Sequence, residues 1–226
     1  MKHFALAVLL LLAGLSARGG EPYVCLQPGR TLVYERHKAN GRLERTTTME
    51  YTAVRESGDG RLVDYIFTLR GPGGAALYGG GAPMTTAVAA DGTISQDLGA
   101  SLQVVLHNMF PGVDQSVETV PALIPAELKP GDKLPDARCT VKTGIMTHTM
   151  AITERKVLRF ERIRVPAGEF QCVVIREHKV EKGLGRNRET VSDSWYAAGI
   201  GPVRHDTYRY SGGNLKLEAS EILKKY

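Results

Sequence analysis

The sequence predicts a mainly β protein in which one large, curved antiparallel sheet, shaped like a half-barrel, wraps around a single α-helix. Most of the chain consists of short runs rich in Val, Thr, Tyr and Phe between hairpin turns, and only one segment has the spacing of an amphipathic helix. A sheet of eight or more antiparallel strands curls or splits into layers, so one helix suffices to cover its open side. The 226 residues, 42% hydrophobic and 23% charged, are typical of a globular protein and not of a disordered or collagen-like chain.

Residues 1–19 predict a signal peptide. An apolar run from Phe4 to Leu15 is followed by small residues, with cleavage expected after Ala17 or Gly19. This run is shorter than the roughly twenty apolar residues that a bilayer-spanning helix needs. Cys25 lies too far downstream to be the lipidated cysteine of a bacterial lipoprotein. We therefore expect export, to the periplasm or as a secreted protein, of a single mainly β domain over residues 20–226 with no transmembrane anchor.

The first strands are expected over Thr31–His37, Leu43–Glu56 and Arg61–Arg70. The breaks between them contain Asn40-Gly41 and Asp59-Gly60, pairs that readily adopt the positive backbone angles of tight hairpin turns. The glycine-rich section Gly71–Gly81 predicts a flexible loop or a distorted edge strand.

The single helix is expected from Asp97 to Phe110. Its apolar residues recur at spacings of three and four, Asp97 is placed to cap the first turn, and Pro111-Gly112 marks its end. The following stretch, Val120–Asp136, holds four prolines in seventeen residues and predicts an ordered connection with little regular structure.

The remaining chain returns to strands separated by breaks of hairpin length. The expected strands are Ala137–Thr143, Thr147–Phe160, Ile163–Val165, Phe170–Val180, Thr190–Tyr196, Pro202–Tyr210 and Leu215–Leu223. The sequence has no fixed-period repeat and no linker that would divide it into two domains.

Three cysteines, Cys25, Cys139 and Cys172, remain after the predicted cleavage. In an oxidising compartment, three cysteines predict one disulfide and one free thiol. Cys139 with Cys172 is the preferred pairing, because both lie in predicted strands of the C-terminal half. Buried, unpaired thiols at these positions are the competing prediction.

Charge and motif spacing exclude several common functions. Removing Lys2 and Arg18 with the signal leaves 27 of the 29 basic residues against 24 acidic ones, a net charge of +3. The basic residues are spread along strands and form no clustered face, so we expect no nucleic-acid binding. The histidines are scattered singly, with no metal-ligand spacing, and no dinucleotide loop lies in a βαβ context, so no metal or cofactor is expected.

No catalytic residue is expected either. The sequence has no GxSxG elbow, and Cys172 is flanked by apolar residues typical of a buried position. His205 beside Asp206 has the composition of an acid–base pair, but a hydrogen-bonded structural histidine is the simpler interpretation. A site assembled from distant strands would leave no such trace in the sequence.

Three groups of short sequence motifs in the C-terminal half resemble those of a known family. They are Pro130-Gly131-Asp132 with Leu134-Pro135-Asp136, Val165-Pro166-Ala167-Gly168-Glu169-Phe170-Gln171-Cys172, and Trp195-Tyr196 followed by Gly199-Ile200-Gly201-Pro202-Val203. In order and spacing the chain resembles TapB-like exported bacterial proteins, a group of the cell envelope that shares a domain of unknown function. The resemblance implies an exported, mostly β protein and carries no catalytic residues. Its signature residues Pro166, Gly168, Phe170, Trp195, Tyr196, Gly199 and Gly201 are interpreted as structural, at turns and a bulged hairpin.

Two functions of different classes follow from this sequence. The first is a non-enzymatic envelope protein that binds a lipid or another apolar small molecule in the concavity of the sheet. The second is an adaptor that binds another envelope protein, for example along an exposed strand edge. A hydrolase whose site is not visible in the sequence is the third.

Overall fold

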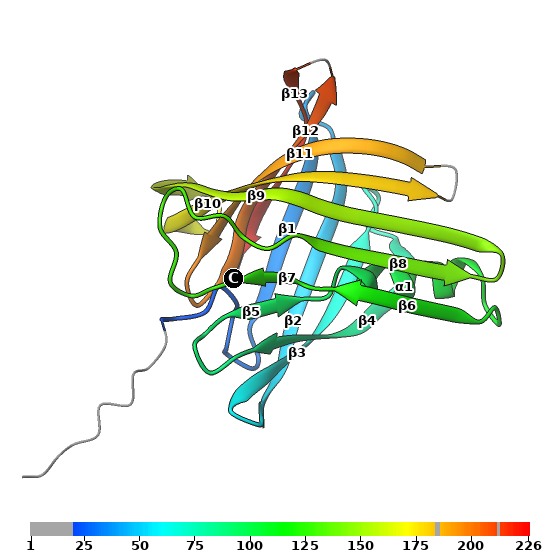
Figure 1. The fold of residues 1–226 in the computed structure, drawn as a ribbon, viewed down its shortest axis with the longest axis horizontal. Coiled ribbons are helices and arrows are strands. Elements are labelled where there is room, and N and C mark those ends of the chain that lie inside the picture. The colour runs from blue at the N-terminus through cyan, green and yellow to red at the C-terminus, as the bar shows by residue number, and fades with distance from the viewer. Residues whose placement is uncertain (1–19, 184–185, 212) are drawn as a thin grey trace, which may run out of the picture.

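The structure is a computed structural model that describes residues 20–183, 186–211 and 213–226. The predicted signal peptide lies outside the described residues. The described chain forms a nearly closed, barrel-like antiparallel sheet of thirteen strands with a single helix, as Figure 1 shows. The predicted fold class is therefore confirmed.

The N-terminal half of the chain follows the predicted pattern of hairpins and one helix. Its elements are β1 (Thr31–Lys38), β2 (Leu43–Ser57), β3 (Gly60–Arg70), β4 (Ala76–Val88), β5 (Ile94–Gln96) and α1 (Leu98–Met109). Asp97 caps α1, because its side chain accepts a hydrogen bond from the backbone N–H of Gly99. The predicted helix and its cap are confirmed.

The C-terminal half is built of longer strands than expected. Its elements are β6 (Gln115–Val120), β7 (Ala122–Ile124), β8 (Ala137–Thr143), β9 (Met146–Val165), β10 (Gly168–Gly183), β11 (Arg186–Ala197), β12 (Gly201–Ser211) and β13 (Asn214–Lys225). The two expected strands Thr147–Phe160 and Ile163–Val165 are one twenty-residue strand, β9.

The structure decides between two alternatives and adds one short strand. The glycine-rich section is a loop only at its start; from Ala76 it is part of β4, which pairs with β3 through an irregular register, as expected of a distorted edge strand. The proline-rich connection includes the short strand β7, which pairs with β5.

Sheet order explains how the barrel closes. The strands follow the order β6-β8-β9-β10-β11-β12-β13-β1-β2-β3-β4-β5-β7, so the last strand of the chain pairs with the first. The two ends of the sheet, β6 and β7, do not pair with each other. Helix α1 contacts β4, β6 and β8 and fills this side of the barrel (Figure 1).

Below the barrel, the segment before β1 packs into the core. Tyr23, Val24 and Cys25 are buried, and the rings of Tyr23 and Tyr196 meet edge to face with centroids 6.4 Å apart. These three residues belong to the main hydrophobic core cluster. In the described part of the chain, no helix has the length and apolar character needed to cross a membrane.

The predicted disulfide between Cys139 and Cys172 is wrong: all three cysteines are free and buried. Cys139 lies opposite Met150 of β9, whereas Cys172 lies opposite Glu161 of the same strand. Those partners are separated along one strand by many times the roughly 6 Å that a disulfide allows between Cα atoms. Location of both cysteines in strands of the C-terminal half was therefore not sufficient for pairing.

Candidate ligand site inside the barrel

A cavity of about 160 Å³ lies where the first and last strands of the chain meet. Its lining comes from β1, β2, β3, β12 and β13. The lining residues are Tyr34, Arg45, Thr47, Met49, Phe67, Pro202, Arg204, His205 and Glu221. We refer to the polar lining residues as the polar wall and to Met49 and Phe67 as the apolar wall.

Strand register brings the polar residues together. Glu221 on β13 is the cross-strand partner of His205 on β12 and of Arg36 on β1. Tyr34 on β1 lies opposite Thr47 on β2. Directly opposite residues of antiparallel strands project from the same face of the sheet, so these side chains meet inside the barrel although they are far apart in sequence.

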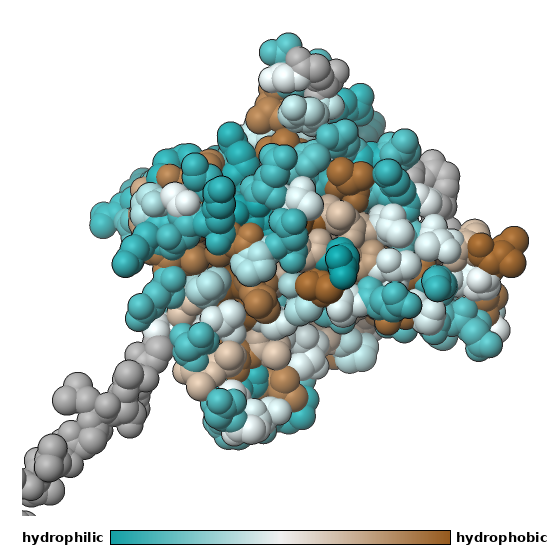
Figure 2. Space-filling view, in the orientation of Figure 1, coloured by the Kyte–Doolittle hydropathy of each residue, from teal (hydrophilic) through white to brown (hydrophobic). Residues whose placement is uncertain are grey.

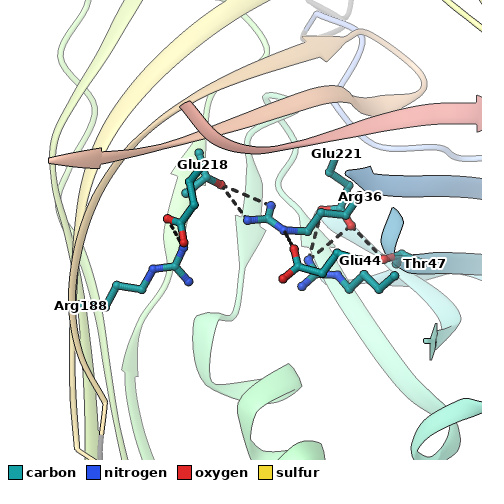
Figure 3. Close-up of polar contacts among 8 residues, drawn as sticks. Arg36, Glu44, Thr47, Arg188, Glu218 and Glu221 are labelled. Atoms are coloured by element: carbon teal, nitrogen blue, oxygen red, sulfur yellow. Dashed lines mark hydrogen bonds and ion pairs between the residues drawn. The ribbon is translucent and has the colours of Figure 1, made fainter. Parts of the chain in front are cut away.

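The Glu221 carboxylate is the centre of the polar wall. It accepts a hydrogen bond from Thr47 Oγ1 at 2.9 Å and pairs with the Arg45 guanidinium at 3.3 Å. Figure 3 shows Glu221 and Thr47 facing each other across this space. The Tyr34 hydroxyl and Arg45 Nε are buried and have no hydrogen-bond partner among the residues that the structure describes. Buried donors without partners are costly, so this wall offers groups that a ligand could satisfy.

His205 supplies a neutral polar group to the same cavity. Its Nδ1 lies 2.8 Å from Ser194 Oγ. Burial lowers the pKa of His205 to about 4, and the positive charges of Lys179 and Arg36 act in the same direction. The imidazole is therefore uncharged at neutral pH, and the hydrogen bond at Nδ1 leaves Nε2 as the ring nitrogen for a ligand.

Further ion pairs extend the polar wall along the barrel interior. Arg36 pairs with Glu44 at 2.9 Å and donates to the Thr207 hydroxyl at 3.3 Å. Beside it, Arg188 pairs with Glu218 at 2.5 Å, and Figure 3 shows how these pairs lie next to one another. Except for Arg36, the side chains of these pairs are partly exposed, between 27% and 39%. Partly exposed ion pairs contribute little to stability, so stability alone does not explain this cluster of charges.

The apolar wall is formed by Met49 and Phe67, which are cross-strand partners on β2 and β3. A second cavity of about 130 Å³ shares Met49 and Pro202 with the first and continues towards Tyr51, Tyr65 and the start of α1. The two cavities together form an interior with amphiphilic character.

Three residues here have the composition of a hydrolytic triad. Ser194, His205 and Glu221 lie on the neighbouring strands β11, β12 and β13. Ser194 is only 2% exposed, and an imidazole with a pKa of about 4 is a weak base at neutral pH. Glu221 is already engaged by Arg45 and Thr47. The arrangement is therefore better suited to holding a molecule than to hydrolysing one.

The other candidate chemistries of the sequence are not assembled into a site. Within the described ranges, no three His, Cys, Asp or Glu side chains form a group that would hold a metal ion. Asp206, the sequence neighbour of His205, points to the other face of β12 and pairs with Arg204 at 2.7 Å. Burial raises the pKa of the Cys172 thiol to about 12, so it is not a nucleophile at neutral pH.

The signature residues of the sequence lie at hairpins and in the core. Pro166 is in the two-residue turn that joins β9 and β10, and the Phe170 ring meets the Tyr226 ring edge to face with centroids 5.5 Å apart. Trp195 is buried, donates to Glu161 and lies 5.0 Å below the Arg204 guanidinium. Of the remaining four, Gly201 has a φ of +106°, which favours glycine.

None of the seven signature residues lines the 160 Å³ cavity. Sequence reasoning also missed the residues that do form its polar wall, Tyr34, Arg45 and Glu221. The only related signal was His205, which was noted beside the wrong partner. No short spacing could have identified the site, since its members come from both ends of the chain.

The fold and the cavity define a barrel-like protein with a polar site in its interior. The chain belongs to the DUF3108-like family, whose sequence model matches residues 27–218. The narrower resemblance to TapB-like proteins stays a prediction. The search of curated proteins found no match.

Two solved structures share the fold. One is a protein from Bacteroides fragilis with a YmcC-like fold that is inferred to be exported, with a TM-score of 0.74 and 19% identity. The other is from Parabacteroides distasonis and is inferred to be a lipoprotein, with a TM-score of 0.71 and 17% identity. Each match covers 91% of this chain and 98% of the other. At these identities the likeness establishes the fold alone.

Proposed function

We propose that this protein is a non-enzymatic, exported envelope protein that binds a small amphiphilic molecule inside its barrel. The observation that supports this function is the 160 Å³ cavity, which is lined by the apolar side chains of Met49 and Phe67 and by Tyr34 and Arg45, whose buried hydroxyl and Nε have no partner among the described residues. A few placed polar groups in an otherwise apolar cavity are typical of small-molecule sites. Export, to the periplasm or as a secreted protein, is supported by the apolar N-terminal run of the sequence.

The size of the cavity narrows the ligand class. At about 30 Å³ per molecule, it has room for about five waters, well below the roughly 300 Å³ at which sites for drug-sized ligands begin. A long acyl chain is therefore disfavoured. Paired charges and a neutral imidazole favour a ligand with hydroxyl, amide or carboxyl groups at one end and a short apolar part at the other.

The adaptor function is the second candidate and is supported by a different observation. β4 pairs with β3 along its length but with β5 only at Ala87 and Val88, and a groove of about 660 Å³ lies between its other residues and α1. An extended peptide could add to such an edge. Pro83 lies in this edge and cannot donate a backbone hydrogen bond, which is a known way to block pairing. We therefore place this function second.

Ligand binding is tested by thermal denaturation with a panel of short-chain acids, amino acids, sugars and long-chain fatty acids, followed by calorimetry on any hit. We expect a small amphiphile to raise the melting temperature. Tyr34→Phe should weaken its binding by about tenfold, as the loss of one buried hydrogen bond of about 1.4 kcal/mol implies.

Two variants make the binding experiment decisive. Arg45→Met removes one of the two guanidinium groups that line the cavity. Arg55→Met removes a guanidinium that pairs with Asp64 on the exposed surface. Binding should be lost in Arg45→Met and kept in Arg55→Met. If only long-chain fatty acids bind, or if both arginine variants bind as the wild type does, the proposed site is wrong. Capture of a polypeptide with no small-molecule hit would favour the adaptor.

A further inference from the structure

Apolar side chains are exposed at the end of the barrel where β8 turns into β9. Ile145 is fully exposed, Met109 is 55% exposed and Val113 is 39% exposed. Figure 2 shows apolar atoms in brown at the end of the molecule where β8 ends in Figure 1. We call Met109, Val113 and Ile145 the apolar tip.

The three residues come from two segments that contact each other. Met109 is the last residue of α1, and Val113 follows in the loop to β6. The backbone N–H of Gly144, which precedes Ile145, donates to the carbonyl of Asp114 at 3.3 Å. A Cβ at Gly144 would lie 3.4 Å from the Val113 side chain. The loop with Val113 and the turn with Ile145 are therefore adjacent, and Met109 ends the helix that leads into this loop.

Local structure does not require these residues to be apolar. Gly144 and Ile145 form the two-residue turn between β8 and β9, and Gly144 has a φ of +57°. Turns of this kind favour Gly, Asn, Asp and Ser. Their backbone geometry does not need a branched apolar side chain that projects into solvent. Residues that depart from a local rule without a structural gain often serve a function.

Basic residues flank the apolar tip. Lys142 precedes the turn and is exposed. Lys182, also exposed, lies near the end of β10, where the following Gly183 packs against Thr147 of β9. Asp114 is the acidic residue nearest to the turn. A protruding apolar tip between lysines has the chemistry of a segment that inserts among lipid headgroups of negative charge.

We propose that the apolar tip docks this protein on an anionic lipid surface. Ile145, Met109 and Val113 enter the boundary between headgroups and acyl chains, while Lys142 and Lys182 pair with anionic headgroups. The tip is convex and formed by a turn, a shape that enters a lipid surface more easily than it fits a groove in a protein partner. Because the apolar area is small, binding is weak and reversible.

The test is co-sedimentation of the purified protein with vesicles of phosphatidylcholine and phosphatidylglycerol in a 7:3 ratio at millimolar lipid. The wild type binds these vesicles, binds pure phosphatidylcholine less, and is released by 0.5 M NaCl, because salt screens the lysine contribution. Ile145→Asp lowers binding by about tenfold, the effect of about 1.4 kcal/mol of lost transfer energy. Leu217→Asp, the same change at an exposed leucine outside the apolar tip, leaves binding unchanged.

A second variant reports whether residue 145 inserts into the lipid surface. Ile145→Trp binds at least as well as the wild type, and its additional emission shifts to the blue when anionic vesicles are added. Absence of wild-type binding, equal binding of Ile145→Asp and the wild type, or no emission shift in Ile145→Trp would each overturn the proposal. Neither variant changes a buried residue, so both are expected to fold.

Discussion

Arg155 holds the open seam of the barrel together, and its removal should be among the most costly single changes in this protein. Its side chain is fully buried and donates from Nε to Glu177 at 2.8 Å. The Nη1 atom of Arg155 donates to the carbonyls of Leu123 at 3.1 Å and Pro135 at 2.8 Å. Leu123 belongs to β7, the last strand of the sheet, so one guanidinium joins this end to β9 and β10.

The expected cost of Arg155→Met follows from what the change leaves behind. Glu177 would be a buried carboxylate without its partner, and the carbonyls of Leu123 and Pro135 would lose a donor. Breaking a buried ion pair in this way costs about 3–5 kcal/mol. For a chain of this size each kcal/mol lowers the melting temperature by about 2–4 °C, so we expect a fall of about 6–20 °C.

Urea unfolding followed by circular dichroism measures this loss. The double variant Arg155→Met with Glu177→Met should be more stable than Arg155→Met alone, because it removes the unpaired charge. Arg164→Met is the control, since Arg164 is 83% exposed and its contact with Glu169 is worth at most about 1 kcal/mol. The reasoning is refuted if Arg155→Met and Arg164→Met have equal stability, or if the double variant is no more stable than Arg155→Met.

Three further predictions concern His205, the thiols and one glycine. Burial lowers the pKa of His205 to about 4 in the folded state against 6.5 as its ordinary value, so the unfolded chain takes up this proton first. Stability should therefore fall by about 3 kcal/mol as the pH falls from 6.5 to 4, and less in His205→Gln; equal falls in urea unfolding would contradict this. All three cysteines should be slow towards Ellman's reagent in the native protein and titrate as three thiols in urea without reductant, whereas one thiol per chain would reveal a disulfide. Gly201→Val should lower stability by about 1–3 kcal/mol through strain at a φ of +106°, and an unchanged melting temperature would show that the backbone accommodates the side chain.

The sequence predicted those parts of the fold that depend on local chemistry. The helix after Asp97 has both an apolar spacing and a cap, and β8 was predicted with its observed bounds because Ala137–Thr143 alternates between buried and exposed positions. The first two hairpin turns were predicted from the pairs Asn40-Gly41 and Asp59-Gly60. These signals lie within a few residues of one another, so a single sequence contains them.

The parts that were missed depend on contacts between distant segments. The strand β7 is only three residues long and lies in a proline-rich connection, and β4 begins within a glycine-rich section, so neither has a long run of β-branched and aromatic residues from which a strand is predicted. The pairing of β13 with β1 decides which residues meet inside the barrel, and nothing near Tyr34 in the sequence indicates Glu221. The interior site therefore became visible only with the closed sheet.

The most direct test of a ligand site inside the barrel is a high-resolution crystal structure of the protein purified from its native envelope. If the barrel binds a ligand, we expect electron density for a small molecule in the 160 Å³ cavity, with a polar atom within hydrogen-bond distance of the Tyr34 hydroxyl or Arg45 Nε. A cavity that contains only ordered water at these two groups, even after soaking with every compound that raises the melting temperature, would contradict it.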